Sequence, residues 1–338
     1  DLAVASRADT MFATYDLAYL DPDGCHDDPL GAATGSVMVF PGGPTGIGTT
    51  PSFRIWGQDG GDFVDRVVGG FDHDGDGVAD LALASDLSSG VRIVAGRSPD
   101  PAGIVTVCDG VERVATSGRG GSSLRAVPDL DGDGCDELLV GVGSEVVGGV
   151  ATGTEHLLWG PCGGAATETV IAPPAGHGVF GLLGAAGDLD SDGRLDLVFS
   201  SAGYDTGGEA IGAVWVATAD AVETFPRHPL AAGELGAADL VSRWTLGDPD
   251  LVGTSYGTQL GSELSVVVPP DGGGSWVAVG APLHSIGGQS GTGGVLLYAW
   301  SADTGLGEPG LVGPRAVVAG DGTAALLGGT LAASEFPG

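Results

Sequence analysis

An acidic loop pattern that occurs three times constrains the fold of this chain more than any other feature of its sequence. The copies are DHDGDGVADL at Asp72–Leu81, DLDGDGCDEL at Asp129–Leu138 and DLDSDGRLDL at Asp188–Leu197. Their first aspartates are 57 and 59 residues apart. This spacing predicts a structural unit of about sixty residues that repeats along the chain.

Short apolar runs flank each acidic loop, and their lengths indicate strands rather than helices. The runs before the loops are Arg66–Phe71, Leu124–Val127 and Leu182–Ala186, and those after them are Leu81–Ala84, Leu138–Val142 and Leu197–Phe199. A third run covers Val91–Ala95, His156–Trp159 and Ala213–Ala217, and a weaker fourth covers Ile104–Val107, Glu168–Ile171 and Ser242–Leu246. Four strands per unit predict an all-β protein built from the four-stranded antiparallel blades of a β-propeller.

A further unit lacks the acidic loop but keeps this frame. It reads Tyr256–Gly257, then LGSELSVVV, then WVAVGAP at 276–282 and GGVLLYAW at 293–300. The words YG and GAP, together with the acidic loops, resemble the FG-GAP repeats of integrin-alpha-type calcium-binding β-propellers. The resemblance covers nearly the whole chain, and it implies a single β-propeller domain over residues 1–338.

The two ends of the chain match complementary parts of one repeat. DLAVAS at 1–6 resembles the strand after an acidic loop, and AALLGGTLAAS at 324–334 resembles a first strand. GSVMVF at 35–40 and SFRIWG at 52–57 supply the third and fourth strands of this unit. We therefore expect a ring closed by a split blade that joins the termini, which removes an exposed sheet edge. The five expected blades are 324–338 with 1–57, 58–115, 116–176, 177–250 and 251–320; a seven-bladed ring, or a fragment of one, is the alternative.

The spacing within each acidic loop is that of a calcium ligand set. Carboxylates at positions 1, 3, 5 and 9 and a backbone carbonyl at position 7 supply hard oxygen ligands, and glycine at position 6 allows the chain to wrap around the ion. Without an ion, carboxylates this close together repel one another. An EF-hand is excluded, because position 12 is Leu83, Val140 or Phe199 instead of glutamate. We expect three structural Ca²⁺ sites, with a solvated acidic turn as the alternative.

Each predicted site has five ligands. Loop one contributes Asp72, Asp74, Asp76, the Val78 carbonyl and Asp80; loop two contributes Asp129, Asp131, Asp133, the Cys135 carbonyl and Glu137; loop three contributes Asp188, Asp190, Asp192, the Arg194 carbonyl and Asp196. Loop two departs from the pattern by its glutamate at position 9. His73, at position 2 of loop one, is expected to point outward.

Four cysteines are present, and none of them lies in a CxxC motif. In a blade of alternating strands, Cys135 and Cys162 fall on one face of the same blade, whereas Cys25 and Cys108 fall on the opposite face of neighbouring blades. We predict the disulfides Cys135–Cys162 and Cys25–Cys108, which would place the chain in an oxidising compartment. Four buried free thiols are the alternative.

Composition excludes some partners. The formal net charge is −32, and no lysine occurs, so the clustered basic residues that bind nucleic acid or an anionic membrane surface are absent from the sequence. No apolar run is long enough to span a membrane, which predicts no membrane insertion within this chain. The chain begins with Asp1 rather than Met, and we expect it to be part of a larger polypeptide or assembly.

The sequence contains no visible catalytic constellation. Long loops at residues 7–34, 143–154, 202–212 and 283–292 are expected to gather on the face opposite the acidic loops, where a protein or glycan ligand would bind. We expect a secreted or cell-surface module for binding, adhesion or surface assembly. The alternatives are a polysaccharide lyase or hydrolase on a propeller scaffold, and a purely structural module of a larger surface protein.

Overall fold

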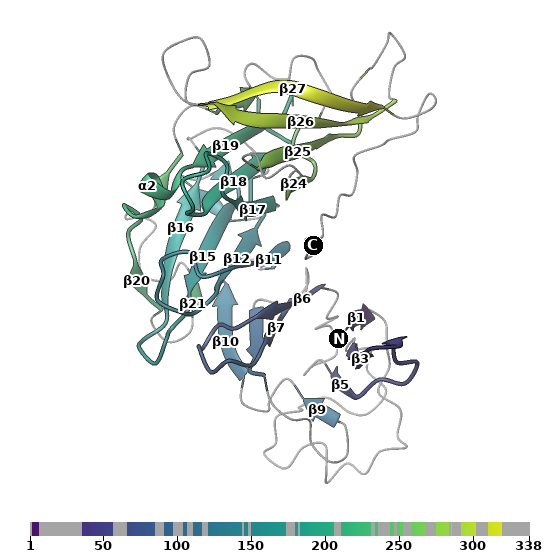
Figure 1. Ribbon diagram of the computed structural model, residues 1–338. Helices are drawn as coiled ribbons and strands as arrows, with labels where there is room; N and C mark the ends of the chain where they lie inside the picture. The colour runs from purple at the N-terminus through teal and green to yellow at the C-terminus, as the bar shows by residue number, and fades with distance from the viewer. Residues whose placement is uncertain are drawn as a thin grey trace. The chain divides into compact units, whose positions relative to one another are not determined.

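Strands and turns make up almost all of the described chain (Figure 1). The computed structural model describes residues 2–6, 36–56, 66–84, 91–96, 104–106, 111–116, 121–143, 145–147, 150–173, 180–181, 183–205, 211–230, 234–235, 244–246, 249–252, 259–267, 275–283, 285, 292–301 and 310–319. Within these ranges one short helix occurs, α2 (Ala219–Val222). The predicted all-β class is confirmed, with several antiparallel sheets.

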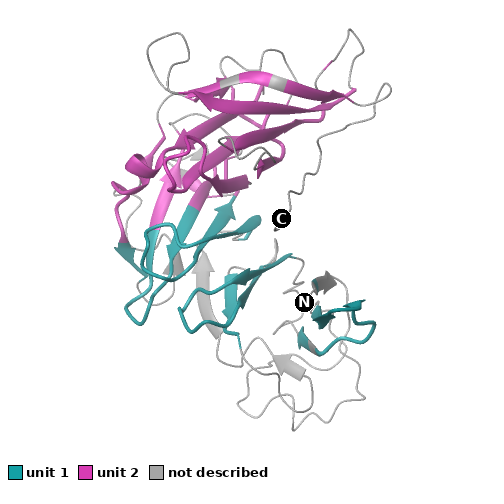
Figure 2. Ribbon diagram, in the orientation of Figure 1, with its two compact units in different colours: residues 1–142, 156–168, 228–240 teal, residues 143–155, 169–227, 241–338 magenta. Residues whose placement is uncertain are grey.

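The chain divides into two compact units (Figure 2). Unit 1 comprises residues 1–142, 156–168 and 228–240, and unit 2 comprises residues 143–155, 169–227 and 241–338.

Two sheets lie within unit 1. The first has the order β1 (Leu2–Ser6), β2 (Ser36–Phe40), β5 (Phe53–Trp56) and β9 (Ile104–Thr106), with β3 (Gly42–Gly43) and β4 (Gly46–Ile47) forming a small hairpin. The second has the order β21 (Glu234–Leu235), β10 (Val111–Thr116), β8 (Val91–Val94), β7 (Asp80–Ala84) and β6 (Arg66–Phe71). Loop one joins β6 to β7.

The third sheet contains loop two. Its order is β11 (Ser123–Val127), β12 (Glu137–Val142), β15 (Thr154–Trp159), β16 (Thr167–Ala172) and β20 (His228–Pro229), and β22 (Trp244–Thr245) also pairs with β16. The boundary between the units falls within β15 and β16. Loop two joins β11 to β12.

Two sheets lie within unit 2, which also contains the hairpin β13 (Val146–Val147) and β14 (Val150–Ala151). One sheet has the order β17 (Leu183–Gly187), β18 (Asp196–Ser201), β19 (Ala213–Ala217) and β23 (Leu251–Val252). The other has the order β24 (Leu264–Val267), β25 (Trp276–Ala281), β26 (Gly294–Ser301) and β27 (Gly310–Ala319). Loop three joins β17 to β18.

The first three strands of the four predicted units between 58 and 320 are confirmed, but two of the predicted fourth strands are wrong. Residues 104–106 form β9, which pairs in parallel with β5 of the preceding sheet, and β10 takes the fourth place by pairing with β8. Likewise, Trp244 and Thr245 pair with β16, and β23 is the strand that pairs with β19. In both cases two strand-like runs follow each other closely, and the apolar pattern alone does not say which sheet each run joins.

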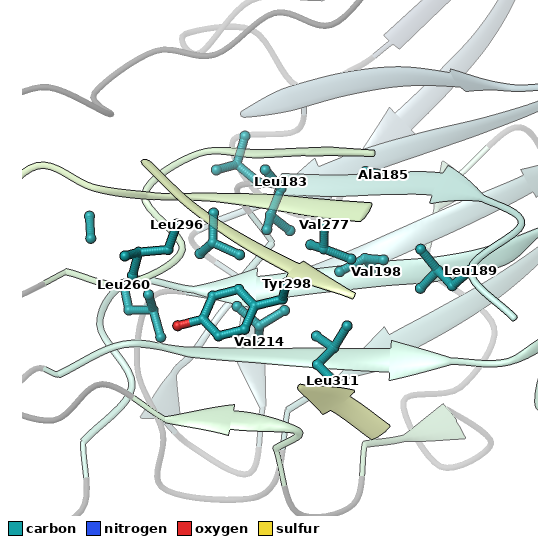
Figure 3. Packing of buried hydrophobic residues seen from close by; sticks show 13 residues of the cluster. Leu183, Ala185, Leu189, Val198, Val214, Leu260, Val277, Leu296, Tyr298 and Leu311 are labelled. Atoms are coloured by element: carbon teal, nitrogen blue, oxygen red, sulfur yellow. The ribbon is translucent and has the colours of Figure 1, made fainter. Parts of the chain in front are cut away.

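Burial explains why these runs form strands. Every residue of β12 and β18 is buried, so both faces of these strands are covered. The apolar run of β12 predicts this, whereas β18 also buries Asp196, Ser200 and Ser201. In unit 2 one core cluster joins the last two sheets (Figure 3). It includes Val198, Val214, Val277 and Leu296, and burial among such side chains raises the pKa of the Tyr298 hydroxyl.

The closing strand expected at 324–334 lies outside the described residues, as does the loop at 7–34. The pairing of β1 with β2, and of β2 with β5, confirms the three strands predicted near the N-terminus. The five-bladed ring and its split blade stay predictions.

Candidate metal centres

Each acidic loop brings the carboxylates of three residues close together. The groups are Asp72, Asp74 and Asp80 in loop one, Asp129, Asp131 and Asp133 in loop two, and Asp188, Asp190 and Asp196 in loop three; one oxygen from each residue lies within 4.8 Å of the others in its group. Positions 1 and 3 thus meet in every loop as predicted. The side chains of Asp76, Asp192 and Glu137 fall outside these groups.

Glycine at position 6 is required by backbone conformation. Gly77, Gly134 and Gly193 have φ values of +84°, +95° and +85°, and a Cβ at any of them would meet no atom within 4 Å. The restriction is therefore the left-handed backbone and not lack of space. In each loop the position 6 N–H also donates to the carboxylate at position 1, at 2.7, 3.2 and 3.0 Å respectively.

The carboxylate at position 5 shapes the second half of each loop. Asp76, Asp133 and Asp192 each accept the N–H of the residue at position 7, at 2.7, 3.0 and 2.8 Å. This bond folds the chain back at the residue whose carbonyl is the predicted ligand, namely Val78, Cys135 or Arg194. The assignment of these three carbonyls as ligands stays a prediction.

The acid at position 9 is buried in every loop and joins the two ends of that loop. Asp80, Glu137 and Asp196 accept the N–H of position 2, at 2.8, 2.7 and 2.8 Å. Asp80 and Asp196 also accept an N–H from just beyond the third strand, donated by Gly96 and Ala219. Burial raises the pKa of both aspartates, and these N–H bonds oppose the rise.

Loop two has a different carboxylate group, because Glu137 is not part of it. The side chain of Glu137 is fully buried, and burial raises its pKa to about 8. The Glu137 carboxylate lies outside the group of Asp129 and Asp131, in which Asp133 is the third member. The departure in sequence at position 9 therefore corresponds to a departure in geometry.

Loop three carries its own cation, which the ligand spacing did not predict. The guanidinium of Arg194 donates to Asp192 at 2.7 Å and to Asp220 at 2.6 Å, and it pairs with Glu223 at 2.9 Å. The backbone and guanidinium N–H groups of Arg194 lower the pKa of the Asp192 carboxyl. Arg194 thus offsets part of the charge of loop three from one side.

Asp136 is a functional candidate that the pattern missed. At position 8 of loop two, its Oδ1 accepts the N–H of Asp129 at 2.9 Å, and its Oδ2 accepts the N–H of Asp72 in loop one at 2.8 Å. The available signal was an acid at a position where the other loops have Ala79 and Leu195.

The expectation that His73 points outward is wrong. Its side chain is 3% exposed, and its Nδ1 lies 3.0 Å from the Asp136 carbonyl oxygen. The ring also meets the edge of Phe71 at a centroid distance of 6.1 Å. The residue is held inward because the start of β12 lies beside loop one and offers it an acceptor.

The disulfide Cys135–Cys162 is confirmed, with 5.7 Å between its Cα atoms. It fastens loop two to the turn that follows β15. A Cβ at Gly75 would lie 2.8 Å from the Cys135 Sγ, so the tip of loop one packs directly against this disulfide. Cys25 and Cys108, the other predicted pair, lie outside the described residues.

The donor set of all three loops fits a hard divalent cation, because every grouped atom is a carboxylate oxygen. A buried pair of a different kind, His156 and Glu168, lies 3.0 Å apart in unit 1. Its side chains are 1% and 2% exposed, so it is an internal link rather than a surface site.

No protein-family model matches the chain, and no curated protein matches it either. Among the described residues, no helix is both long and apolar enough to span a membrane.

Proposed function

We propose that this chain is a calcium-stabilised β-propeller module that works by binding a protein or glycan at the surface of a cell or outside it. The observation that carries the calcium assignment is the threefold grouping of carboxylates at equivalent places, between the first and second strands of successive sheets. Without a cation, each of the three acidic turns would be destabilised, because its carboxylates repel one another.

The strand arrangement supports the propeller. Within unit 1 the first strands β6 and β11 lie beside each other, and within unit 2 β17 lies beside β24. Neighbouring first strands are expected where successive sheets are blades around one axis. The acidic loop of each blade would then stand at the same end of that axis.

Calcium suits these loops better than magnesium. The carboxylates at positions 1, 3 and 5 are partly or fully exposed, and several are already hydrogen-bonded to loop N–H groups. Such a cage can adjust to the six to eight oxygen ligands of Ca²⁺, whereas Mg²⁺ needs near-ideal octahedral geometry and keeps more water.

The long loops support a binding role. Val146, in the connection from β12 to β15, is 51% exposed, and Leu283, in the connection from β25 to β26, is 39% exposed. Single exposed apolar side chains are ordinary on protein surfaces, so the support for a binding role is that these connections are surface segments held by buried strands, where ligand contacts are often found. The disulfide Cys135–Cys162 supports an oxidising, extracellular location.

Calorimetric titration with CaCl₂ tests the metal assignment. We expect three calcium ions per chain, weaker heats with MgCl₂, and a lower melting temperature in EGTA. At extracellular affinities of about 10⁻⁴–10⁻³ M, millimolar calcium would add on the order of 1 kcal/mol per site. The triple variant Asp74→Asn, Asp131→Asn and Asp190→Asn should bind none. A melting temperature that is the same in millimolar CaCl₂ as in EGTA would refute the assignment.

A glycan and matrix-protein binding screen, run with calcium and with EGTA, tests the role. Calcium-dependent binding without turnover supports an adhesion module. Cleavage of a polysaccharide would instead assign an enzyme. The absence of both binding and cleavage would assign a structural module of a larger protein.

A further inference from the structure

Asp136 joins two acidic loops through four polar contacts. Its carboxylate accepts the N–H of Asp129 at 2.9 Å and the N–H of Asp72 at 2.8 Å. Its own N–H donates to the Asp72 carbonyl at 2.8 Å, and its carbonyl oxygen lies 3.0 Å from Nδ1 of His73. Asp72 and Asp129 are the position 1 residues of loops one and two, so one side chain fixes the first predicted ligand of both loops.

Other contacts also join loop one to loop two. Gly75, at the tip of loop one, packs against the disulfide of Cys135, which belongs to loop two. A Cβ at Gly160, next to that disulfide, would lie 2.9 Å from the His73 carbonyl oxygen. The two loops are therefore packed against each other in unit 1. A displacement of either loop would shift the residues of the other loop that contact it.

Loop three lacks the side-chain part of this connection. The Asp188 carbonyl accepts the N–H of Ser275 at 3.1 Å, which repeats the backbone bond between Asp136 and Asp72. However, position 275 holds a serine, and Leu195 stands in loop three where Asp136 stands in loop two. The carboxylate bridge is thus particular to loops one and two.

We propose that loops one and two bind their cations cooperatively, and that Asp136 is the positioning residue that couples them. This inference rests on the proposed calcium binding. A cation in loop one would hold Asp72 in place, which orders the Asp136 carboxylate, and that carboxylate in turn holds Asp129 in its ligand position. The second ion then binds a loop that is already ordered, so its binding no longer includes the loss of conformational entropy.

The coupling is measured by calorimetric titration with CaCl₂ alone, in the variant Asp190→Asn, in which the cation site of loop three is disabled. Adding Asp74→Asn leaves loop two as the single site, and adding Asp131→Asn leaves loop one. We expect each isolated site to bind about fivefold or more weakly than in the two-site protein, which is the usual lower range for coupled sites. This comparison leaves Asp136 itself untouched.

Asp136→Asn in the two-site background then tests the bridge. An amide has one acceptor oxygen instead of two, so the variant keeps one N–H contact and loses the other. We expect it to bind two ions with the affinities of the isolated sites. Asp220→Asn, which changes an exposed aspartate on α2, is the matched control and should keep the coupling; far-UV circular dichroism checks that both variants are folded.

The outcomes separate the two proposals. One calcium ion bound by each single-site variant, with the affinity that the same site has in the two-site protein, would overturn the coupling and leave calcium binding intact. Coupling that persists in Asp136→Asn would overturn the role of Asp136. No calcium binding by any variant would overturn both.

Discussion

The backbone N–H of Gly193 donates to Oδ2 of Asp188 at 3.0 Å, and it does so from a φ of +85°. The same bond joins Gly77 to Asp72 and Gly134 to Asp129. In loops one and three the other oxygen of this carboxylate also accepts loop N–H groups, those of Gly75 and Asp76 in loop one and that of Asp192 in loop three. The position 1 carboxylate is therefore held by the backbone of its own loop, whose turn requires the left-handed glycine.

Replacing Gly193 should separate conformational strain from steric crowding. Gly193→Ala puts a Cβ into open space but forces alanine into the left-handed region, and we expect a loss of about 1–2 kcal/mol in the free energy of unfolding. Gly193→Asn should lose less, because asparagine tolerates this region better. Urea unfolding in EGTA measures both variants. Equal losses for alanine and asparagine would show that strain is not the cause.

Removing the guanidinium of Arg194 should increase the calcium affinity of loop three. Arg194→Gln leaves Asp192 without its guanidinium partner, so the carboxylates of loop three lose a positive neighbour. We expect a few-fold tighter calcium binding at loop three and a larger gain in melting temperature on adding CaCl₂. Because the Arg194 network is half-exposed, high salt should reduce the difference. Weaker calcium binding by Arg194→Gln would contradict this interpretation.

The acidic loops were predictable because their chemistry is local. The ligand groups form within nine residues, and the positive φ at position 6 follows from glycine in the pattern. The strands β6, β12 and β18 were predictable for the same reason, since each is a short apolar run next to a loop with a strong turn signal.

Contacts between distant segments could not be predicted in this way. Asp136 reaches Asp72 across 64 residues, and Arg194 reaches Asp220 and Glu223 across 26 and 29. No spacing rule links such pairs, because they meet only after sheets and loops have packed. The two wrong fourth strands have a related cause: sheet membership depends on neighbouring edges rather than on the run itself.

A partly buried acid in unit 2, Asp250, should make stability depend on pH. Asp250 accepts the N–H of Val216 at 2.7 Å, and burial raises the pKa of its carboxyl. Folding thus favours the protonated form, so the stabilisation is fully present below the ordinary aspartate pKa and is lost as pH rises through the raised value.

Asp250→Asn tests this sign. The amide is neutral and can still accept the Val216 N–H, so we expect the variant to be more stable than the parent at pH 7, with the difference disappearing at low pH. Urea unfolding across the pH range measures it. Repeating the series in high salt screens the general repulsion of an acidic chain. A variant that is less stable at pH 7 would rule the prediction out.

The disulfide Cys135–Cys162 should stabilise unit 1 and also support loop one. It closes a segment of 27 residues, for which loss of the cross-link costs about 3.5 kcal/mol in the chain-entropy model. The double variant Cys135→Ala and Cys162→Ala should lose a similar amount of stability in urea unfolding. Because Gly75 packs against the Cys135 Sγ, the variant should also bind calcium more weakly at loop one, which is read out in the Asp131→Asn, Asp190→Asn background. A thiol reductant should reproduce the calcium effect in that background and leave the double-alanine version unchanged; sensitivity of both to the reductant would place the effect at other cysteines.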